Sequence, residues 1–373
     1  MKGNGKTNTP NNTRYRIISP LARLPISTCR QHMKKAIVIL ITICLSLHSC
    51  SKSTNSSDRK NHISEYGFKG KVKSVNSELF NLIPEKDTFR IGEKINGISI
   101  NRNELLEFNK TGNLTFSKEF LANGKVSDEI LNTYDKNNKL TERKVIDNYG
   151  KGSVTNYQYI YNSSDSLEQV IVSGKNFKRI HKIVRDKKVR PIKNLIIQND
   201  TILTTYVVEY DQKNNVIAEK QFKNQNNLVK LIDREFNPKN LKVREQIVEY
   251  SSWDTLRYQN EFIYDKNQNL ILGKYNIEND SNFNTVKNTY YKNGKLKESI
   301  SEFGESDYLL IQNQKFNENG DLIVQAVNTS DGKTKDIWEY KLKYDTNNNW
   351  IEKIEYKNNE PLRIVKREIE YYK

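Results

Sequence analysis

Two segments of the chain carry acidic and amide side chains at the alternate spacing that calcium-binding loops use. They are Asp265, Asn267, Asn269 and Asp345, Asn347, Asn349. A calcium loop of this type also needs Gly at the next position and a bidentate Glu at the twelfth. Leu270 and Trp350 stand where Gly is required. We therefore interpret both segments as hairpin turns, in which Asx side chains cap the backbone, and expect no metal site.

The densest basic run of the chain lies between Lys175 and Lys193 and is interrupted only by Asp186. Cations this close together could bind anionic envelope polymers or lipid phosphates, although a solvated hairpin is the plainer interpretation. A second candidate contact is Trp253, because it stands outside any alternating strand pattern. The candidate ligand-binding residues are Trp253, Lys178, Arg179, Lys182, Arg185, Lys187, Lys188 and Arg190.

Residues that could support catalysis are scarce. After Cys50 the chain has no cysteine, and only His62 and His181 remain. Disulfides, thiolate nucleophiles, His-rich zinc sites and His-based triads therefore have almost no material. Carboxylates are plentiful, but nothing holds two of them at the separation that a glycosidase needs, and there is no nucleophile or phosphate-loop motif. We predict a protein that is not an enzyme, with no catalytic residue and no cofactor.

The start of the chain predicts export. Met33, Lys34 and Lys35 precede an apolar run from Ala36 to Leu47, which is too short for a membrane-spanning helix of roughly 20 residues but suits a secretory signal. Cys50, directly after this run, resembles the lipidated cysteine of a bacterial lipoprotein. The resemblance implies cleavage before Cys50, lipidation of its thiol and anchoring in an envelope membrane. Ordinary secretion with a free Cys50 is the alternative.

The remaining N-terminal segments follow from this signal. Residues 1–32 contain no acidic residue and no hydrophobic periodicity, so we interpret them as a non-native upstream extension, with an organellar targeting peptide as the alternative. The signal is assigned to 33–49, and the polar stretch 50–64 to the lipidated cysteine and a flexible tether. The eight basic residues before Ser51 reduce the 61 of the whole chain to 53, against 45 acids. This modest excess makes nucleic acid a poor partner.

The rest of the chain, 65–373, is organised by one repeated unit. An aromatic anchor is followed by a short turn rich in Asx and Gly and then, usually, by an apolar residue. The nine anchors, which we expect to be structural, are Phe108, Tyr134, Tyr161, Tyr210, Phe236, Tyr264, Tyr290, Phe316 and Tyr344. Successive anchors are 26–28 residues apart, except for one step of 49 between Tyr161 and Tyr210. This long step indicates a degenerate copy within 174–200, and the fixed period indicates a repeat architecture.

The segments that flank the turns alternate with period two. Trp338, Tyr340, Leu342 and Tyr344 share one face, while Glu339, Lys341 and Lys343 share the other. This pattern is typical of a half-buried antiparallel strand. With a second, looser turn between successive anchors, each period comprises two strands. We predict an all-β fold, which is a repetitive antiparallel β-meander of hairpins. The twist of its strands would coil this meander or close it into a barrel-like sheet. The pattern leaves open whether the sheet is open or closed.

The repeated Tyr-Asp-x-x-Asn/Gly unit resembles the YD or RHS repeat, and most closely the short, toxin-less RHS-like envelope lipoproteins of Gram-negative bacteria. The opening stretch from Gly67 to Ser74 and the closing stretch Arg367 to Tyr372 resemble the ends of these proteins. In large relatives such repeats wrap a shell around a toxin, and we expect no toxin domain here. The resemblance implies an outer-membrane lipoprotein of a group without an assigned activity. No acidic run follows Cys50, so we expect the protein on the periplasmic side rather than on the cell surface.

Three functions remain open. The first is a non-enzymatic, lipid-anchored envelope protein that binds a polysaccharide or a protein through its sheet. The second is an immunity or structural factor acting by protein–protein contact. The third is a glycan-processing enzyme, which the shortage of catalytic residues disfavours. The recurring tyrosines could offer a stacking platform for sugars, although a core ladder is the plainer interpretation. The oligomeric state and the identity of the partner stay undetermined.

Overall fold

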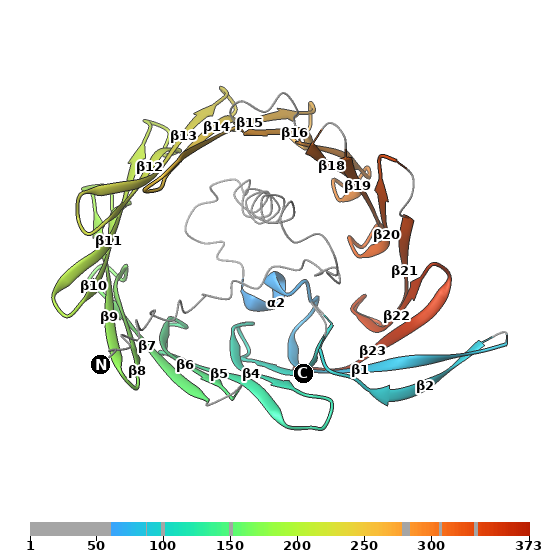
Figure 1. Cartoon of the computed structure of the whole chain (residues 1–373). Coiled ribbons are helices and arrows are strands. Elements are labelled where there is room, and N and C mark those ends of the chain that lie inside the picture. The colour runs from blue at the N-terminus through green and yellow to red at the C-terminus, as the bar shows by residue number, and fades with distance from the viewer. Residues whose placement is uncertain are drawn as a thin grey trace, which may run out of the picture.

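The computed structural model describes residues 61–373 apart from 87, 98–100, 149–151, 278–283, 306–307 and 332–334. The predicted signal, the upstream extension and Cys50 lie outside the described residues. In the described part, the chain forms one short helix, α2 (His62–Glu65), and 23 strands, which surround a central space in Figure 1. The predicted all-β meander is confirmed, and the open question is answered because the sheet closes on itself.

The first half of the sheet contains thirteen strands. They are β1 (Val72–Glu85), β2 (Thr88–Lys94), β3 (Asn103–Phe108), β4 (Leu114–Phe120), β5 (Val126–Tyr134), β6 (Leu140–Asp147), β7 (Ser153–Tyr161), β8 (Leu167–Gly174), β9 (Phe177–Arg185), β10 (Pro191–Gln198), β11 (Thr201–Tyr210), β12 (Val216–Lys223) and β13 (Asn227–Phe236).

The second half contains ten strands and ends close to the C-terminus. They are β14 (Lys242–Tyr250), β15 (Thr255–Tyr264), β16 (Leu270–Ile277), β17 (Asn284–Tyr290), β18 (Leu296–Glu305), β19 (Tyr308–Phe316), β20 (Leu322–Thr329), β21 (Lys335–Tyr344), β22 (Trp350–Lys357) and β23 (Glu360–Tyr371).

Each strand pairs antiparallel with its neighbours in sequence, except where the barrel closes. There β1 lies between β23 and β3, and pairs antiparallel with both. The far half of β1 also forms a hairpin with β2, which pairs with no other strand and projects beyond the ring (Figure 1). The barrel wall therefore has 22 strands, all of them except β2.

The closing pair is itself a copy of the repeat. In the hairpins the anchor faces the residue that closes its turn, as Phe108 faces Leu114, and a β-bulge follows. Tyr371 at the end of β23 faces Val72 at the start of β1 with the same bulge, and it lies 27 residues after Tyr344. The eleventh copy is thus assembled from the two ends of the described chain, because β1 occupies the place of the strand that would follow Tyr371.

The turns have the chemistry that their composition predicts. In the copy after Tyr134, Asp135 Oδ1 accepts hydrogen bonds from Asn137 N and Lys139 N, both at 2.8 Å. The fourth turn residue has positive φ, for example 59° at Asn138 and 84° at Gly112. This conformation costs Gly nothing because it has no Cβ, and it costs Asn little because its short polar side chain can hydrogen-bond locally.

The degenerate copy keeps the hairpin although its sequence has drifted. Strands β9 and β10 enclose a turn in which Asp186 Oδ1 accepts from Lys188 N and Arg190 N, both at 2.9 Å. Arg185 takes the anchor position, and Val189 takes the position with positive φ, at 63°. The 49-residue step is therefore two complete repeats.

The driest core lies where the barrel closes. The largest fully buried side chains, below 2% exposed, are Leu79, Leu106, Val72, Val75 and Asn103. All of them belong to β1 or β3. We refer to β23, β1, β3 and the segment 61–71 that covers them as the seam.

Segment 61–71 packs on the inner side of the seam, where Figure 1 shows α2 inside the ring. Ile63 and Phe68, each 7% exposed, pack with Val75, Leu106 and Phe108. The Oδ1 atom of Asn61 caps α2 by accepting from Ser64 N at 3.0 Å. The folded region therefore includes 61–64, which the sequence analysis had assigned to the tether, because Ile63 supplies an apolar side chain that the seam buries.

The packing of α2 also identifies the two faces of the wall. Residues paired across strands share a face. Val75 faces Leu106 on β3, and both contact the helix inside the ring, so their face is the inner wall. Following the register from strand to strand places every anchor and every turn-closing partner on this wall.

Candidate functional site

The inner wall is rich in aromatic rings. Besides the anchors, the register places the following side chains on it: Tyr157, Tyr159, Phe177, Tyr206, Tyr258, Phe262, Tyr275, Phe303, Trp338, Tyr340 and Trp350. Many of these rings, such as Tyr159 and Tyr258, are only half-buried because the wall is one layer thick. Between the rings stand amide and charged groups. Such a surface can stack on sugar rings and hydrogen-bond their hydroxyls.

The anchor tyrosines also connect each repeat to the one before it. The hydroxyl of Tyr134 donates to Leu114 O at 2.8 Å, and Tyr264 and Tyr290 make the same bond one repeat back. Arg185 replaces this bond in the degenerate copy, since its Nη2 donates to Leu167 O at 2.9 Å. The predicted structural role of the anchors fits these contacts, and their rings still form part of the inner surface.

One inner-wall cluster of charges, on β12 to β15, has its charges matched. Arg234 donates to Glu245 at 2.7 Å and to Glu219 at 2.6 Å, and Lys242 donates to Glu245 at 3.2 Å. Burial alone would raise the pKa of Glu245, but Lys242 and Arg234 outweigh it, so the pKa is lowered. Asn260 donates to the second oxygen of Glu245 at 3.3 Å. Each buried charge has a partner, as a structural network requires.

A second cluster lies on β22 and β23 and is less evenly matched. Glu355, a buried acid, accepts from Asn101 at 3.1 Å and forms a close ion pair with Arg363. Lys353, 9% exposed, has its ammonium 4.9 Å from the Trp350 ring. The guanidinium of Arg367 stacks 3.3 Å from the centroid of the same ring. Burial, with a contribution from Arg367, lowers the pKa of Lys353 to about 8.

The sequence analysis did not single out Lys353, Arg367 or Trp350. A β-bulge at Ile351 places Trp350 and Lys353 on the same face, as their partners Tyr344 and Leu342 on β21 show. Strict alternation along β22 would place Trp350 and Lys353 on opposite faces. The sequence of β22 alone therefore predicts an inward-facing Trp350 and a solvent-exposed Lys353. The sequence held no signal for this cluster, because the register shift that follows each anchor is visible only once the strands are paired.

The outer wall carries paired charges. Examples are Lys220 with Glu209 at 2.8 Å and Arg244 with Glu235 at 3.3 Å. Among the described residues, no helix is long and apolar enough to span a bilayer.

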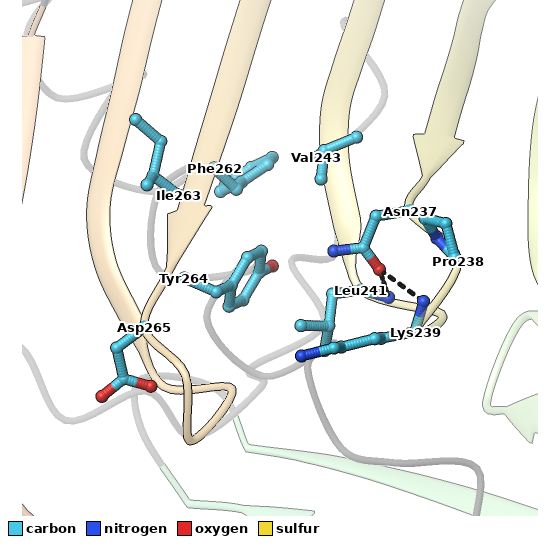
Figure 2. Close-up of a pocket in the computed structure, with 9 residues that line it drawn as sticks. All are labelled: Asn237, Pro238, Lys239, Leu241, Val243, Phe262, Ile263, Tyr264 and Asp265. Carbon is cyan, nitrogen blue, oxygen red and sulfur yellow. Dashed lines mark hydrogen bonds between the residues drawn. The ribbon is translucent and has the colours of Figure 1, made fainter.

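A pocket of about 400 Å³ lies between two neighbouring hairpins near the anchor turns. Figure 2 shows Val243, Phe262 and Tyr264 directed toward it. Its polar neighbour Asn237 is occupied by its own turn, since its Oδ1 accepts from Lys239 N and Leu241 N at 3.0 Å. Most of the residues that line the pocket are apolar or aromatic, so it offers mainly apolar contact.

The candidate basic residues do not share one surface. Arg179 and Arg185 lie on the inner wall, Lys178 and Lys182 on the outer wall, and Lys187, Lys188 and Arg190 in the turn. Arg179 donates to Gln198 at 2.8 Å, and Arg190 forms an ion pair with Asp186 at 2.6 Å. The alternation of β9 divides the run between two faces.

Trp253 lies at the tip of the β14–β15 hairpin, at the opposite end of the barrel from the anchor turns, and is 90% exposed. Tyr250 and Leu256 beside it are 36% and 43% exposed. The structure thus separates Trp253 from the basic run. Asp265 and Asp345, the first residues of the calcium-like segments, cap hairpin turns as expected. Within the described ranges, no three His, Asp, Glu or Cys side chains converge as a metal site would require.

No family model matches the chain, and no curated protein matches its sequence. The crystal structure of TcdB2-TccC3-Cdc42 is similar at 11% identity and a TM-score of 0.36, over 77% of this chain and 18% of that one. The structure of TcdB2-TccC3 without its hypervariable C-terminal region is similar at 12% identity and a TM-score of 0.29, over 74% of this chain and 20% of that one. A porin-like protein from Bacteroides uniformis is similar at 10% identity and a TM-score of 0.29, over 65% of this chain and 96% of that one. This chain spans about a fifth of the first two structures.

Proposed function

We propose that this protein is a non-enzymatic RHS-like envelope lipoprotein that binds a polysaccharide along the inner wall of its barrel. The observation that supports this proposal is the inner wall itself, where half-buried aromatic rings alternate with amide and charged groups. Aromatic rings stack on the apolar faces of sugars, and amides, acids and bases bond their hydroxyls.

The test is a polysaccharide-binding array with the full-length chain and three variants. Tyr159→Ala and Tyr258→Ala each remove a half-buried ring from the inner wall, while Tyr356→Ala removes a ring from the outer wall as a control. We expect both inner variants to weaken binding, since each loses an aromatic ring that could stack on a sugar. Unchanged binding by both inner variants, or no polysaccharide bound at all, would contradict the proposal.

A protein partner is the second candidate, as an immunity or structural factor. The exposed side chains of Tyr250, Trp253 and Leu256 at one hairpin tip favour it, because aromatic side chains are enriched at interfaces. Trp253→Ala should then abolish crosslinking to a partner without affecting polysaccharide binding. Loss of polysaccharide binding in Trp253→Ala alone would instead move the sugar site to this tip.

Anchoring through Cys50 is part of the proposal. It is supported by the apolar run before Cys50 and by the position of that cysteine. Incorporation of labelled fatty acid into the wild-type chain, and its absence in Cys50→Ser, is the expected result in a Gram-negative host. Labelling that persists in Cys50→Ser would rule out this anchor.

A further inference from the structure

The barrel contains two almost fully buried lysines on its inner wall, and their surroundings differ. Lys242, 6% exposed, donates to Glu245 at 3.2 Å. Lys353, 9% exposed, faces the rings of Trp350 at 4.9 Å and Tyr340 at 6.0 Å. Within the described part of the chain, no carboxylate lies within ion-pair distance of Lys353. A buried ammonium normally has a partner, because desolvation of an unpaired charge costs several kcal/mol.

The acids near Lys353 are engaged elsewhere. Glu355 is occupied by Arg363 and by Asn101, and Asp321 accepts the hydroxyl of Tyr344 at 2.8 Å. Each of these carboxylates contributes favourable electrostatic energy at a distance, yet neither forms an ion pair with Lys353. The ammonium therefore keeps its hydrogen-bonding capacity for a group in the lumen.

Arg367 lies beside this lysine and is in the same situation. Its guanidinium lies between Trp350, at 3.3 Å from the ring centroid, and Phe68, at 5.2 Å. Its buried Nε has no hydrogen-bond partner among the described residues. The acid with the largest electrostatic effect on it is Glu104 on β3, and burial raises the pKa of that carboxyl. Two cations thus flank one aromatic ring without a bonded anion.

We propose that Lys353 and Arg367, together with the Trp350 ring, bind the carboxylate of an acidic sugar in the barrel lumen. The inference rests on the proposed polysaccharide function and specifies its ligand class. Arg and Lys bond carboxylates through charge-assisted hydrogen bonds, and the tryptophan ring supplies an apolar surface for the sugar ring. The charge-matched cluster around Glu245 offers no such opening.

Binding should depend on pH through Lys353. Burial, Arg367 and Arg363 lower its pKa to about 8. Glu355 and Asp321 oppose this shift in part. A bound carboxylate favours the charged ammonium, so binding is accompanied by proton uptake and weakens as pH rises above 8. Lys353→Arg keeps a cation that does not titrate in this range, and should preserve binding while removing this pH dependence.

The experiment is titration calorimetry of the full-length chain with three probes: an oligoglucuronate, a neutral glucose oligomer of the same length, and inorganic phosphate. We expect the oligoglucuronate to bind best, and Lys353→Met and Arg367→Met to weaken it about tenfold each, as loss of a charge-assisted bond predicts. Lys341→Met is the matched control, because Lys341 lies 4.7 Å from the Tyr356 ring on the outer wall of the same hairpin.

The outcomes separate the two proposals. Equal binding of the neutral and acidic oligomers, insensitive to Lys353→Met, would overturn the acidic-sugar site and leave the polysaccharide function standing. Binding of phosphate alone would also overturn it. If neither oligomer binds, the acidic-sugar site is overturned, and the polysaccharide array decides separately whether the proposed function stands. Far-ultraviolet circular dichroism identifies a variant that has merely unfolded. If Lys353→Met unfolds, Lys353→Arg tests the acidic-sugar site instead, since this variant must still bind the oligoglucuronate.

Discussion

The seam and the wall from β5 to β21 are made of the same repeat, but they bury their side chains to different extents. At the seam, Val72, Val75 and Leu79 are 0% exposed, and Ile63 and Phe68 of segment 61–71 pack against Val72 and Val75 from inside. Along the wall most inner side chains are half-buried, as Tyr157, Tyr159 and Tyr161 on β7 illustrate. The wall is stabilised mainly by ladder hydrogen bonds and cross-strand contacts, whereas the seam adds a true apolar core.

This difference follows from how the strands find each other. A wall hairpin joins residues close in sequence, so little chain entropy opposes its formation. The seam joins residues almost 300 positions apart, for example Val75 and Ile369. Closing so long a loop costs more entropy, and we infer that the buried core at the seam offsets this cost. The four predictions below test this contrast.

The largest effect should come from removing a seam side chain. Leu79→Ala takes a fully buried side chain out of β1, and we expect a loss of about 2–5 kcal/mol in the free energy of unfolding. Leu256→Ala, at a wall residue that is 43% exposed, should cost under about 0.5 kcal/mol. Chemical denaturation measures both. Equal losses would show that the seam has no special role.

The next effect concerns the anchor hydroxyls. Tyr371 donates to the charged carboxylate of Asp345 and accepts from Asn349 at 2.7 Å, whereas Tyr264 donates to the uncharged backbone carbonyl of Lys242 at 2.8 Å. Tyr371→Phe should therefore cost about 1.5–3 kcal/mol and Tyr264→Phe about 0.5–1.5 kcal/mol. The same denaturation curves give the comparison, and a larger loss for Tyr264→Phe would refute the ranking.

A stabilising change is expected in the wall. Val189 has a φ of 63° in the degenerate turn, a conformation that costs a β-branched residue roughly 1–2 kcal/mol. Val189→Asn restores the residue type that Asn138, Asn214 and Asn348 show at this position. We expect an increase of about 1 kcal/mol in the free energy of unfolding. Val184→Asn on the adjacent strand is the control and should not stabilise the protein.

The smallest effect is a pH dependence confined to one region. His62 Nδ1 accepts from Leu114 N at 3.0 Å, which requires the neutral ring. Burial lowers the pKa of His62, assisted by Arg143 and opposed by Glu65. The unfolded chain therefore binds the proton first, so this contribution to stability is complete above pH 6.5 and is lost as pH falls through the lower pKa of the folded state.

Hydrogen exchange at the Leu114 amide is the measurement for this effect. Exchange should accelerate as the pH decreases below 6.5, relative to the amides of β15, and the acceleration should disappear in His62→Gln. His181→Gln is the control, because burial also lowers the pKa of His181, which lies on β9 in the wall. If the acceleration at the Leu114 amide also disappeared in His181→Gln, His62 would not be the group responsible for the pH dependence.

Much of the fold was predictable because each repeat is specified by interactions between residues that are close in sequence. The Asx residue after most anchors and the Gly or Asn that usually stands three positions later specify the turn, as Asp135 and Asn138 show. The alternation of Trp338, Tyr340 and Leu342 was confirmed on one face. The spacing alone located the degenerate copy, although only the structure revealed that Arg185 replaces a tyrosine hydroxyl.

The candidate site was less predictable. The basic run was visible in the sequence, but the alternation of β9 places Arg179 and Lys178 on opposite faces. Trp253 was correctly expected to be exposed, since a turn offers no cover. Lys353 and Arg367 gave no signal, because their proximity to Trp350 depends on a β-bulge and on pairing between β22 and β23.

The sequence by itself determined the strands, the turns, the period and the all-β class, because each depends on residues only a few positions apart. The tertiary structure decided that the meander closes, that its anchors face inward, and that the eleventh repeat is shared between β1 and β23. These features depend on strand twist accumulated over the whole sheet and on apolar burial between distant segments. Neither quantity can be read from one repeat.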